Sequence, residues 1–113
     1  MNCLFCRIAQ GEIPARVARQ DERMVAFHDI DPKAPVHVLL IPRKHIASIA
    51  QLEAADAGEI GHLFAEARTL AEELGVAQSG YRLVINAGPD AGQSVDHVHL
   101  HLLGGRRLSW PPG

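Results

Sequence analysis

Long apolar runs and an excess of charge of one sign are both absent from this chain of 113 residues. No stretch approaches the roughly 20 consecutive apolar residues that span a bilayer, and the first residues lack the apolar segment of a secretory signal peptide. The 11 basic and 13 acidic residues are scattered and give a formal net charge of −2, so there is no basic stripe for a nucleic acid polymer or a lipid surface. We therefore predict a cytoplasmic protein that binds a small molecule, with no nucleic acid polymer and no membrane among its partners.

Cysteine is scarce as well, and the chain holds only Cys3 and Cys6. In a reducing compartment, such a closely spaced pair more often binds a metal or does redox chemistry than forms a structural disulfide. A Cys-x-x-Cys pair supplies two of the four ligands of a tetrahedral zinc site. The alternative is a metal-free pair of thiols that pack as small apolar side chains. The pair alone leaves both interpretations open.

The composition is that of one compact domain, with 47% apolar and 21% charged residues over a length that suits a single core. We expect residues 1–113 to form that domain. Short apolar runs bounded by turn residues predict strands at 17–19, 24–28, 37–41, 81–86 and 97–103. One long helix, described next, and hairpin-like connections between the strands indicate the α+β class, with helices packed on one face of an antiparallel sheet.

The long helix is predicted from Glu53 to Gly75, where apolar residues recur at helical spacing. Asp56 followed by Glu59 predicts a capping box at its start, and Gly75 suits the left-handed position just past its end. His62 lies off the apolar stripe of this helix. We therefore predict that it is a solvated surface residue.

Histidines alternate with apolar residues in the segment 97–103, which reads HVHLHLL. Successive side chains of a strand point to opposite faces, so His97, His99 and His101 should share one face while the residues between them face the core. Neutral imidazole is nucleophilic and has an ordinary pKa near 6.5, which suits catalysis at neutral pH. An exposed polar face and a zinc site are the two alternatives.

This segment resembles the signature of the histidine triad (HIT) family, His-φ-His-φ-His-φ-φ with φ apolar, at every position. Similarity to the branch of histidine triad nucleotide-binding proteins extends along the chain, at Phe5, 11–14, 26–30, 35–37, 41–45, 93–94 and 104–113. The resemblance implies a five-stranded antiparallel sheet with one long and one short helix. It also implies a homodimer with a ten-stranded sheet, in which the tail 104–113 packs near the partner subunit's site.

The same resemblance implies a hydrolase that cleaves the P–N bond of purine nucleoside 5′-phosphoramidates through a covalent nucleotidyl-histidine on His99. His101 would contact the phosphate and pass a proton to the leaving amine, and His37 would polarise and orient the other histidines. Ser94 would bond to the leaving atom or a phosphate oxygen. The alternatives are a dinucleoside polyphosphate hydrolase or nucleotidyl transferase of the same family, and a non-enzymatic nucleotide-binding regulatory protein.

The resemblance also implies an apolar slot for the purine, a ribose contact and phosphate contacts. It assigns nucleotide binding to Phe5, Ile8, Phe27, His28, Asp29, Ile30, Asn86, Gln93, Ser94, His99, His101 and Trp110. Asp29 suits the ribose hydroxyls, because a carboxylate accepts from a vicinal diol in two places. Structural alternatives remain for several of these residues: Asp29 can open a turn, and Phe5 and Phe27 can belong to the core.

A structural zinc site is the last implication of the resemblance. In several bacterial members, a histidine of the Ile-Pro-x-x-His stretch and the first histidine of the triad complete the site. The ligands here would be Cys3, Cys6, His45 and His97. Such a zinc would anchor the N-terminal turn to the sheet, and the catalysis would not require it.

Overall fold

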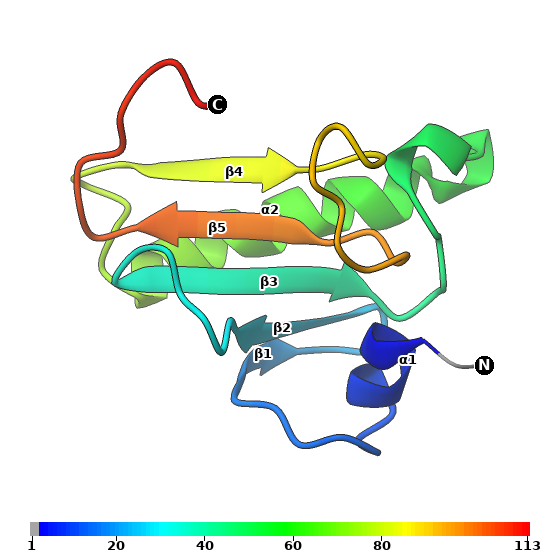
Figure 1. Ribbon diagram of the computed structural model, residues 1–113. Helices are drawn as coiled ribbons and strands as arrows, with labels where there is room; N and C mark the ends of the chain where they lie inside the picture. Colours follow the sequence, from blue (N-terminus) through cyan, green and yellow to red (C-terminus); the bar gives the residue numbers. More distant parts are fainter. Residues whose placement is uncertain (1–2) are drawn as a thin grey trace.

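Five antiparallel strands form one sheet in the order β1-β2-β3-β5-β4 in the computed structural model, which describes residues 3–113 (Figure 1). The strands are β1 (Val17–Gln20), β2 (Met24–His28), β3 (Val36–Pro42), β4 (Tyr81–Ile85) and β5 (Leu100–Gly104). The helices are α1 (Leu4–Ala9) and α2 (Ala57–Glu73), and the 3-10 turns η1 (Ile49–Gln51) and η2 (Ala54–Asp56) precede α2. The predicted α+β class, the five-stranded antiparallel sheet and the pairing of one long with one short helix are confirmed. None of the helices within residues 3–113 combines the length and the apolar character needed to cross a membrane.

The central strand β3 is buried along almost its whole length because side chains cover both faces of the sheet. Leu40 belongs to the larger core cluster, together with Leu63 of α2. Its neighbour Leu39 belongs to a smaller cluster, together with Phe5 of α1. Since adjacent residues of a strand point to opposite faces, the two helices lie on opposite sides of the sheet. The prediction that both helices pack on one face is therefore wrong.

Helix α2 starts later than predicted because the 3-10 turn η2 occupies the expected first turn. Glu53 and Asp56 form the capping box there, and the backbone N–H of Glu53 donates to Oδ2 of Asp56 over 3.1 Å. The predicted box between Asp56 and Glu59 is thus wrong by one turn. Gly75 has the left-handed conformation expected past the helix end, with a φ of 76°.

The histidine run enters the sheet later than predicted, because β5 begins only at Leu100. The backbone N–H of Val98 donates to the carbonyl of Ile46 over 2.7 Å, so this residue is not yet part of the hydrogen-bond ladder of the sheet. The alternation of side chains nevertheless holds. Val98 lies in the core cluster on the α2 side, whereas the rings of His97 and His99 contact Phe5 on the α1 side. His97 and His99 are 0% and 4% exposed, which excludes the interpretation as an exposed polar face.

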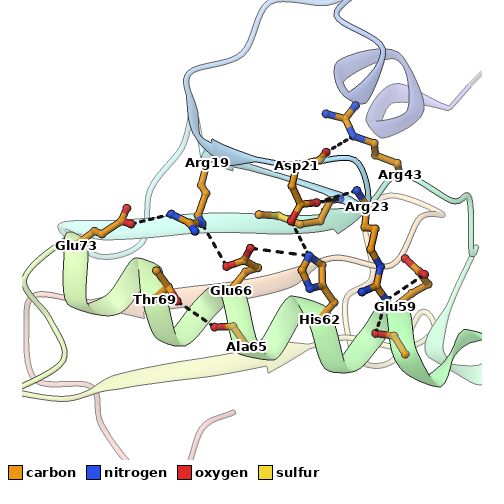
Figure 2. A network of polar contacts seen from close by, with 12 residues as sticks. Arg19, Asp21, Arg23, Arg43, Glu59, His62, Ala65, Glu66, Thr69 and Glu73 are labelled. Carbon is orange, nitrogen blue, oxygen red and sulfur yellow. Dashed lines mark hydrogen bonds and ion pairs between the residues drawn. The ribbon is translucent and has the colours of Figure 1, made fainter.

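A polar network joins β1 and the β1–β2 turn to α2 (Figure 2). Oδ2 of Asp21 lies 2.6 Å from Nε2 of His62. Arg19 on β1 donates to Glu66 over 3.2 Å and to Glu73 over 2.8 Å. His62 is therefore a half-buried member of this network, and its prediction as a solvated surface residue is wrong.

Removing the Asp21 carboxylate with Asp21→Ala is expected to lower the free energy of unfolding at neutral pH by about 2 kcal/mol. The backbone N–H groups of Arg23 (2.7 Å) and Met24 (2.9 Å) would lose their acceptor. Burial alone would raise the pKa of Asp21, but these bonds and the one with His62 outweigh it and lower the pKa to about 2. The carboxylate therefore stabilises the fold fully above its ordinary pKa of 3.8, and this contribution is lost as the pH falls towards 2.

Urea unfolding of wild type and Asp21→Ala, from neutral pH down to about pH 2, checks this prediction. The difference between the two proteins should shrink only in the acid range. Asp90→Ala, at an exposed turn residue, is the matched control and should behave like wild type. A difference that stays constant at every pH would contradict the role given to the carboxylate.

Candidate active site

A pocket of about 280 Å³ opens on the sheet face that α1 covers. Its wall is mostly apolar, with two histidines of the triad among its polar groups. It is lined by Leu4, Phe5, Ile8, Ile13, Pro14, Ala15, Phe27, His28, Asp29, Ile30, Leu39, Ser94, His99 and His101. Nine of the twelve residues predicted to bind the nucleotide are in this lining. They come together from α1, from β2 and the loop after it, and from β5 and the segment before it.

Two phenylalanines form the aromatic part of the pocket wall. The rings of Phe5 and Phe27 meet edge to face with centroids 5.5 Å apart, and both residues are 5% exposed. Phe5 also stands edge-on to His99, with a centroid distance of 5.1 Å. Phe5 and Phe27 are therefore core residues and pocket residues at once, so the two interpretations drawn from the sequence are compatible. Ile30 belongs to the lining and is fully exposed at the rim.

The proton on the ring of His99 has a defined place. Its Nδ1 lies 2.7 Å from the carbonyl oxygen of His97. A carbonyl can only accept, so Nδ1 must carry the proton of the neutral ring. The lone pair is then on Nε2, the nitrogen needed for nucleophilic attack. The backbone of His97 thus fixes the tautomer of His99 in which Nε2 is unprotonated.

A chain of hydrogen bonds fixes the protons of His37 and His101 in the same way. The backbone N–H of Lys33 donates to Nδ1 of His37 over 3.0 Å, which leaves the ring proton of His37 on Nε2. That Nε2 lies 2.9 Å from Nδ1 of His101 and donates to it. The ring proton of His101 is therefore on Nε2, which is buried and has no hydrogen-bond partner within residues 3–113. A buried donor without a partner in the pocket lining suits an anionic oxygen or another acceptor from a ligand.

Both members of this histidine pair are neutral at neutral pH. Burial and, after it, the nearby rings of His99 and His37 lower the pKa of His101 to about 4, although the Asp29 carboxylate opposes them. Burial also lowers the pKa of His37, against the opposing effect of Asp29. The neutral state agrees with the tautomers deduced from the hydrogen bonds. The pair therefore presents a donor, rather than a positive charge, to the pocket.

Asp29 has one oxygen engaged in a turn and the other near the histidine pair. Its Oδ1 accepts from the backbone N–H of Asp31 over 2.8 Å, as the turn interpretation predicts. Its Oδ2 lies 3.5 Å from Nε2 of His37. Asp29 and the exposed Ser94 both line the pocket, where the sequence placed them.

Three residues predicted to bind the nucleotide are outside this lining: Asn86, Gln93 and Trp110. Gln93 uses its amide within the loop before β5, where it accepts from Gly88 N (3.0 Å) and donates to Ala47 O (2.7 Å) and Val95 O (3.0 Å). It therefore shapes the loop that carries Ser94. Asn86 is half-buried just past β4, and the Trp110 ring, 79% exposed, lies against Arg82 with its centroid 5.7 Å from the guanidinium carbon.

The four predicted zinc ligands come together beside this pocket. Nδ1 of His97 lies 3.4 Å from Sγ of Cys3, 3.6 Å from Sγ of Cys6 and 3.2 Å from Nδ1 of His45. Sγ of Cys6 lies 3.3 Å from Nδ1 of His45. Usual Zn–S and Zn–N bond lengths give ligand separations of roughly 3.3 to 3.8 Å in a tetrahedron. The cluster has nearly these separations, and the donor set fits zinc.

Two further features of this cluster suit a metal. Nε2 of His97 lies 2.8 Å from the carbonyl of Pro42 and donates to it, so the lone pair of Nδ1 points to the cluster. Burial and the neighbouring Cys3 raise the pKa of the Cys6 thiol to about 11. Because two buried thiolates are unfavourable side by side, a cation is what would stabilise them there.

Sequence reasoning missed part of the pocket wall and the backbone groups that orient the histidines. Ile13 and Pro14 line the pocket, although the stretch 11–14 was noted only as a similarity. The N–H of Lys33 and the carbonyl of Pro42 set the tautomers of His37 and His97. Backbone N–H and carbonyl groups occur along the whole chain whatever the side chains are, so no pattern of residue types could have indicated these two.

Comparisons with known proteins agree with this geometry. A family model described as the HIT domain matches residues 10–108. An uncharacterized HIT-like protein of Synechocystis sp. is 46% identical over 112 residues, which cover 99% of this chain and 97% of the relative. The crystal structure of a HIT family hydrolase from Legionella pneumophila Philadelphia 1 has a TM-score of 0.97 and 52% identity over 99% of this chain and 100% of that one. A Zn-bound histidine triad family protein from Mycobacterium smegmatis has a TM-score of 0.81 and 30% identity over 97% and 81% of the two chains.

Proposed function

Because this chain belongs to the HIT domain family, we propose that it is a hydrolase that cleaves purine nucleoside 5′-phosphoramidates through a covalent intermediate on His99. The observation that carries the proposal is the pair of complementary tautomers in one pocket. His99 offers a lone pair on Nε2, and His101 offers a proton on Nε2. A nucleophile beside a donor for the phosphoryl or leaving atom is what displacement at phosphorus requires.

The first chemical step forms a bond between Nε2 of His99 and the α-phosphorus while the P–N bond to the amine breaks. A bound phosphate places negative charge beside His101, which raises its pKa above the resting value of about 4. An extra proton can then enter the pair at Nδ1 of His37 when that nitrogen releases the Lys33 N–H. His101 takes the shared proton from His37 on Nδ1 and passes its own Nε2 proton to the leaving amine. The carbonyl of His97 accepts the N–H of His99 and so stabilises the positive charge of the nucleotidylated ring.

The second step reverses the roles. Water attacks the phosphorus, the bond to His99 breaks, and the His37–His101 pair takes up the proton that the water releases. The nucleoside monophosphate leaves and His99 regains its lone pair on Nε2. Protons and charge are thereby balanced over the two steps, and imidazoles alone carry them.

The pocket wall supports a nucleoside as the rest of the substrate. Phe5, Phe27 and Ile8 provide an apolar slot for a planar base, and the exposed Ile30 would be covered by it. Asp29 supplies a carboxylate for the ribose hydroxyls. We assign no nucleotide contact in the same chain to Asn86, Gln93 or Trp110.

We also propose that Cys3, Cys6, His45 and His97 hold a structural zinc, which the chemistry above does not need. The Zn-bound relative from Mycobacterium smegmatis supports a metal in this family. When bound, zinc would supply a closed four-ligand shell that ties the start of α1 to the segments around His45 and His97.

A homodimer is the assembly that we propose. β4 is an outer strand of the sheet, and pairing with its counterpart in a second copy would give the ten-stranded sheet implied by the resemblance. The exposed Trp110 in the tail 104–113 would then be available to the partner's site. Sedimentation velocity, which distinguishes one chain from two, tests this assembly.

The experiment that tests the activity compares substrates of the competing functions. Purified protein is incubated with adenosine 5′-phosphoramidate and, separately, with a diadenosine polyphosphate, and the products are separated by chromatography. We expect AMP and ammonia from the first, with a kcat/KM at least roughly 100 times that for the second, because only the first places a small amine at the pair. Faster cleavage of the polyphosphate would favour a dinucleoside polyphosphate hydrolase. Tight binding of AMP without turnover of either substrate would favour a non-enzymatic nucleotide-binding protein.

A further inference from the structure

The chain turns sharply after β5 and returns to the loop that precedes β3. Gly105 makes this turn with a φ of 92°, and a Cβ at this residue would stand 2.9 Å from Cβ of Pro35. The absence of a side chain therefore lets the backbone pass directly against the loop. The next residue, Arg106, donates to the carbonyl of Lys33 twice, from Nε over 3.2 Å and from Nη2 over 2.8 Å. Its Nη1 donates to the carbonyl of Arg107 over 3.0 Å.

Lys33 is also the residue whose backbone N–H reaches the histidine pair. That N–H donates to Nδ1 of His37, and Nε2 of His37 donates to Nδ1 of His101. Hydrogen bonds on either side of Lys33, joined through the main chain of that residue, thus connect Arg106 in the tail to the pocket. From this path we infer that Arg106 is a positioning residue: its guanidinium holds Lys33 so that the Lys33 N–H keeps the donor proton on Nε2 of His101. The inference deepens the proposed function and rests on it for its kinetic consequence.

The tautomer of His37 matters because the two rings are coupled. If the proton of His37 moved to Nδ1, its Nε2 would become an acceptor and Nδ1 of His101 would have to donate. Nε2 of His101 would then present a lone pair to the pocket. A lone pair repels a phosphoryl oxygen and cannot protonate an amine, so one reversed hydrogen bond inverts the polarity of the site.

The loop that carries Lys33 needs an anchor of this kind. The side chains of Lys33 and Asp31 are 64% and 82% exposed, and their ion pair lies in solvent. Exposed ion pairs contribute little to holding a backbone in place. Arg106 is exposed as well, but two of its charged donors meet one carbonyl, and they act on the main chain of Lys33 itself.

The test combines ring-nitrogen NMR with kinetics in wild type and four variants. Arg106→Ala removes the anchor, Arg106→Lys keeps a cationic donor, and Arg107→Ala changes the neighbouring exposed arginine. Lys33→Ala keeps both backbone groups of Lys33 and removes only its side chain. Long-range ¹H–¹⁵N spectra of the folded proteins show which nitrogen of His37 and of His101 carries the proton, and they require no turnover.

We expect a single tautomer, with protons on Nε2 of His37 and of His101, in wild type and in the two control variants Arg107→Ala and Lys33→Ala. Arg106→Ala should give a mixture of tautomers and about a tenfold lower kcat for adenosine 5′-phosphoramidate, with KM little changed, and Arg106→Lys should restore part of both. Wild-type tautomers in Arg106→Ala would overturn the inference, whatever the activity. A different combination is shifted tautomers in Arg106→Ala together with a wild-type protein that fails to hydrolyse the phosphoramidate. That combination would support the positioning role of Arg106 and overturn the proposed reaction.

Discussion

Replacing His99 by alanine is expected to lower the turnover of adenosine 5′-phosphoramidate by roughly 10⁴-fold or more, because loss of a covalent nucleophile removes the reaction path itself. The apolar slot and Asp29 would remain, so the dissociation constant for AMP should change far less than kcat. Rapid quench with a substrate labelled at phosphorus measures the same point directly. Wild type should carry label on His99 before AMP appears, and His99→Ala should carry none.

The matched control for this experiment is His62→Gln. This histidine lies in the network between the β1–β2 turn and α2, away from the pocket lining, and its variant should keep wild-type turnover at a temperature where it is folded. Label found on His97 or His101 would show that another histidine of the triad is the nucleophile and would contradict the assignment to His99. Turnover retained in His99→Ala would remove the covalent mechanism altogether.

Zinc removal is the second change with a large expected effect, this time on stability. Protein purified without chelators should contain close to one zinc per chain. A ligand present at 100 to 1,000 times its dissociation constant stabilises the folded state by roughly 3 to 4 kcal/mol. Loss of the metal should therefore lower Tm by roughly 10 °C or more in a domain of this size. Thermal unfolding followed by circular dichroism, with and without a chelator, measures this difference.

The double variant Cys3→Ser/Cys6→Ser is the control for nonspecific effects of the chelator. It should contain no zinc, unfold at the lower temperature of the metal-free protein, and show no further response to chelation. Its kcat should stay near that of wild type, since the histidines that react are intact, whereas its KM for the nucleotide should rise because α1 carries part of the slot. A zinc content near zero in the wild-type protein would refute the metal site.

Much of the fold and the site could be predicted because extended chains and helices have fixed periods. The alternation in 97–103 was enough to separate Val98, which lies in the α2-side core, from His99 on the opposite side. It does so although β5 begins only at Leu100, since any extended backbone alternates its side chains. The cluster of Cys3 and Cys6 with His45 and His97 follows the resemblance, and its ligand atoms all lie within 4.8 Å of one another.

What could not be predicted depends on tertiary partners rather than on local pattern. His62 looks like a surface residue on a helical projection, yet Asp21 from another element bonds to it. Gln93 lies next to Ser94 in the chain, but its amide is engaged by backbone groups of the loop. Arg106 contacts a main-chain carbonyl, and because every residue type has one, the identity of its partner could not be predicted from the sequence.

Because α1 is short, we expect it to be less stable than the sheet and α2. A helix of six residues is far below the roughly 12 at which an isolated helix becomes even marginally stable, so neighbours must hold it. Its start is fixed at the cluster of Cys3 and Cys6, and its end by Arg43, whose Nη1 donates to the carbonyl of Ala9 over 2.6 Å. The sheet and α2, by contrast, share a large apolar core of their own. Because α1 depends on these contacts and on the smaller apolar cluster, we expect it to loosen before the sheet and α2 do, and this loosening would weaken binding of a base in the proposed slot.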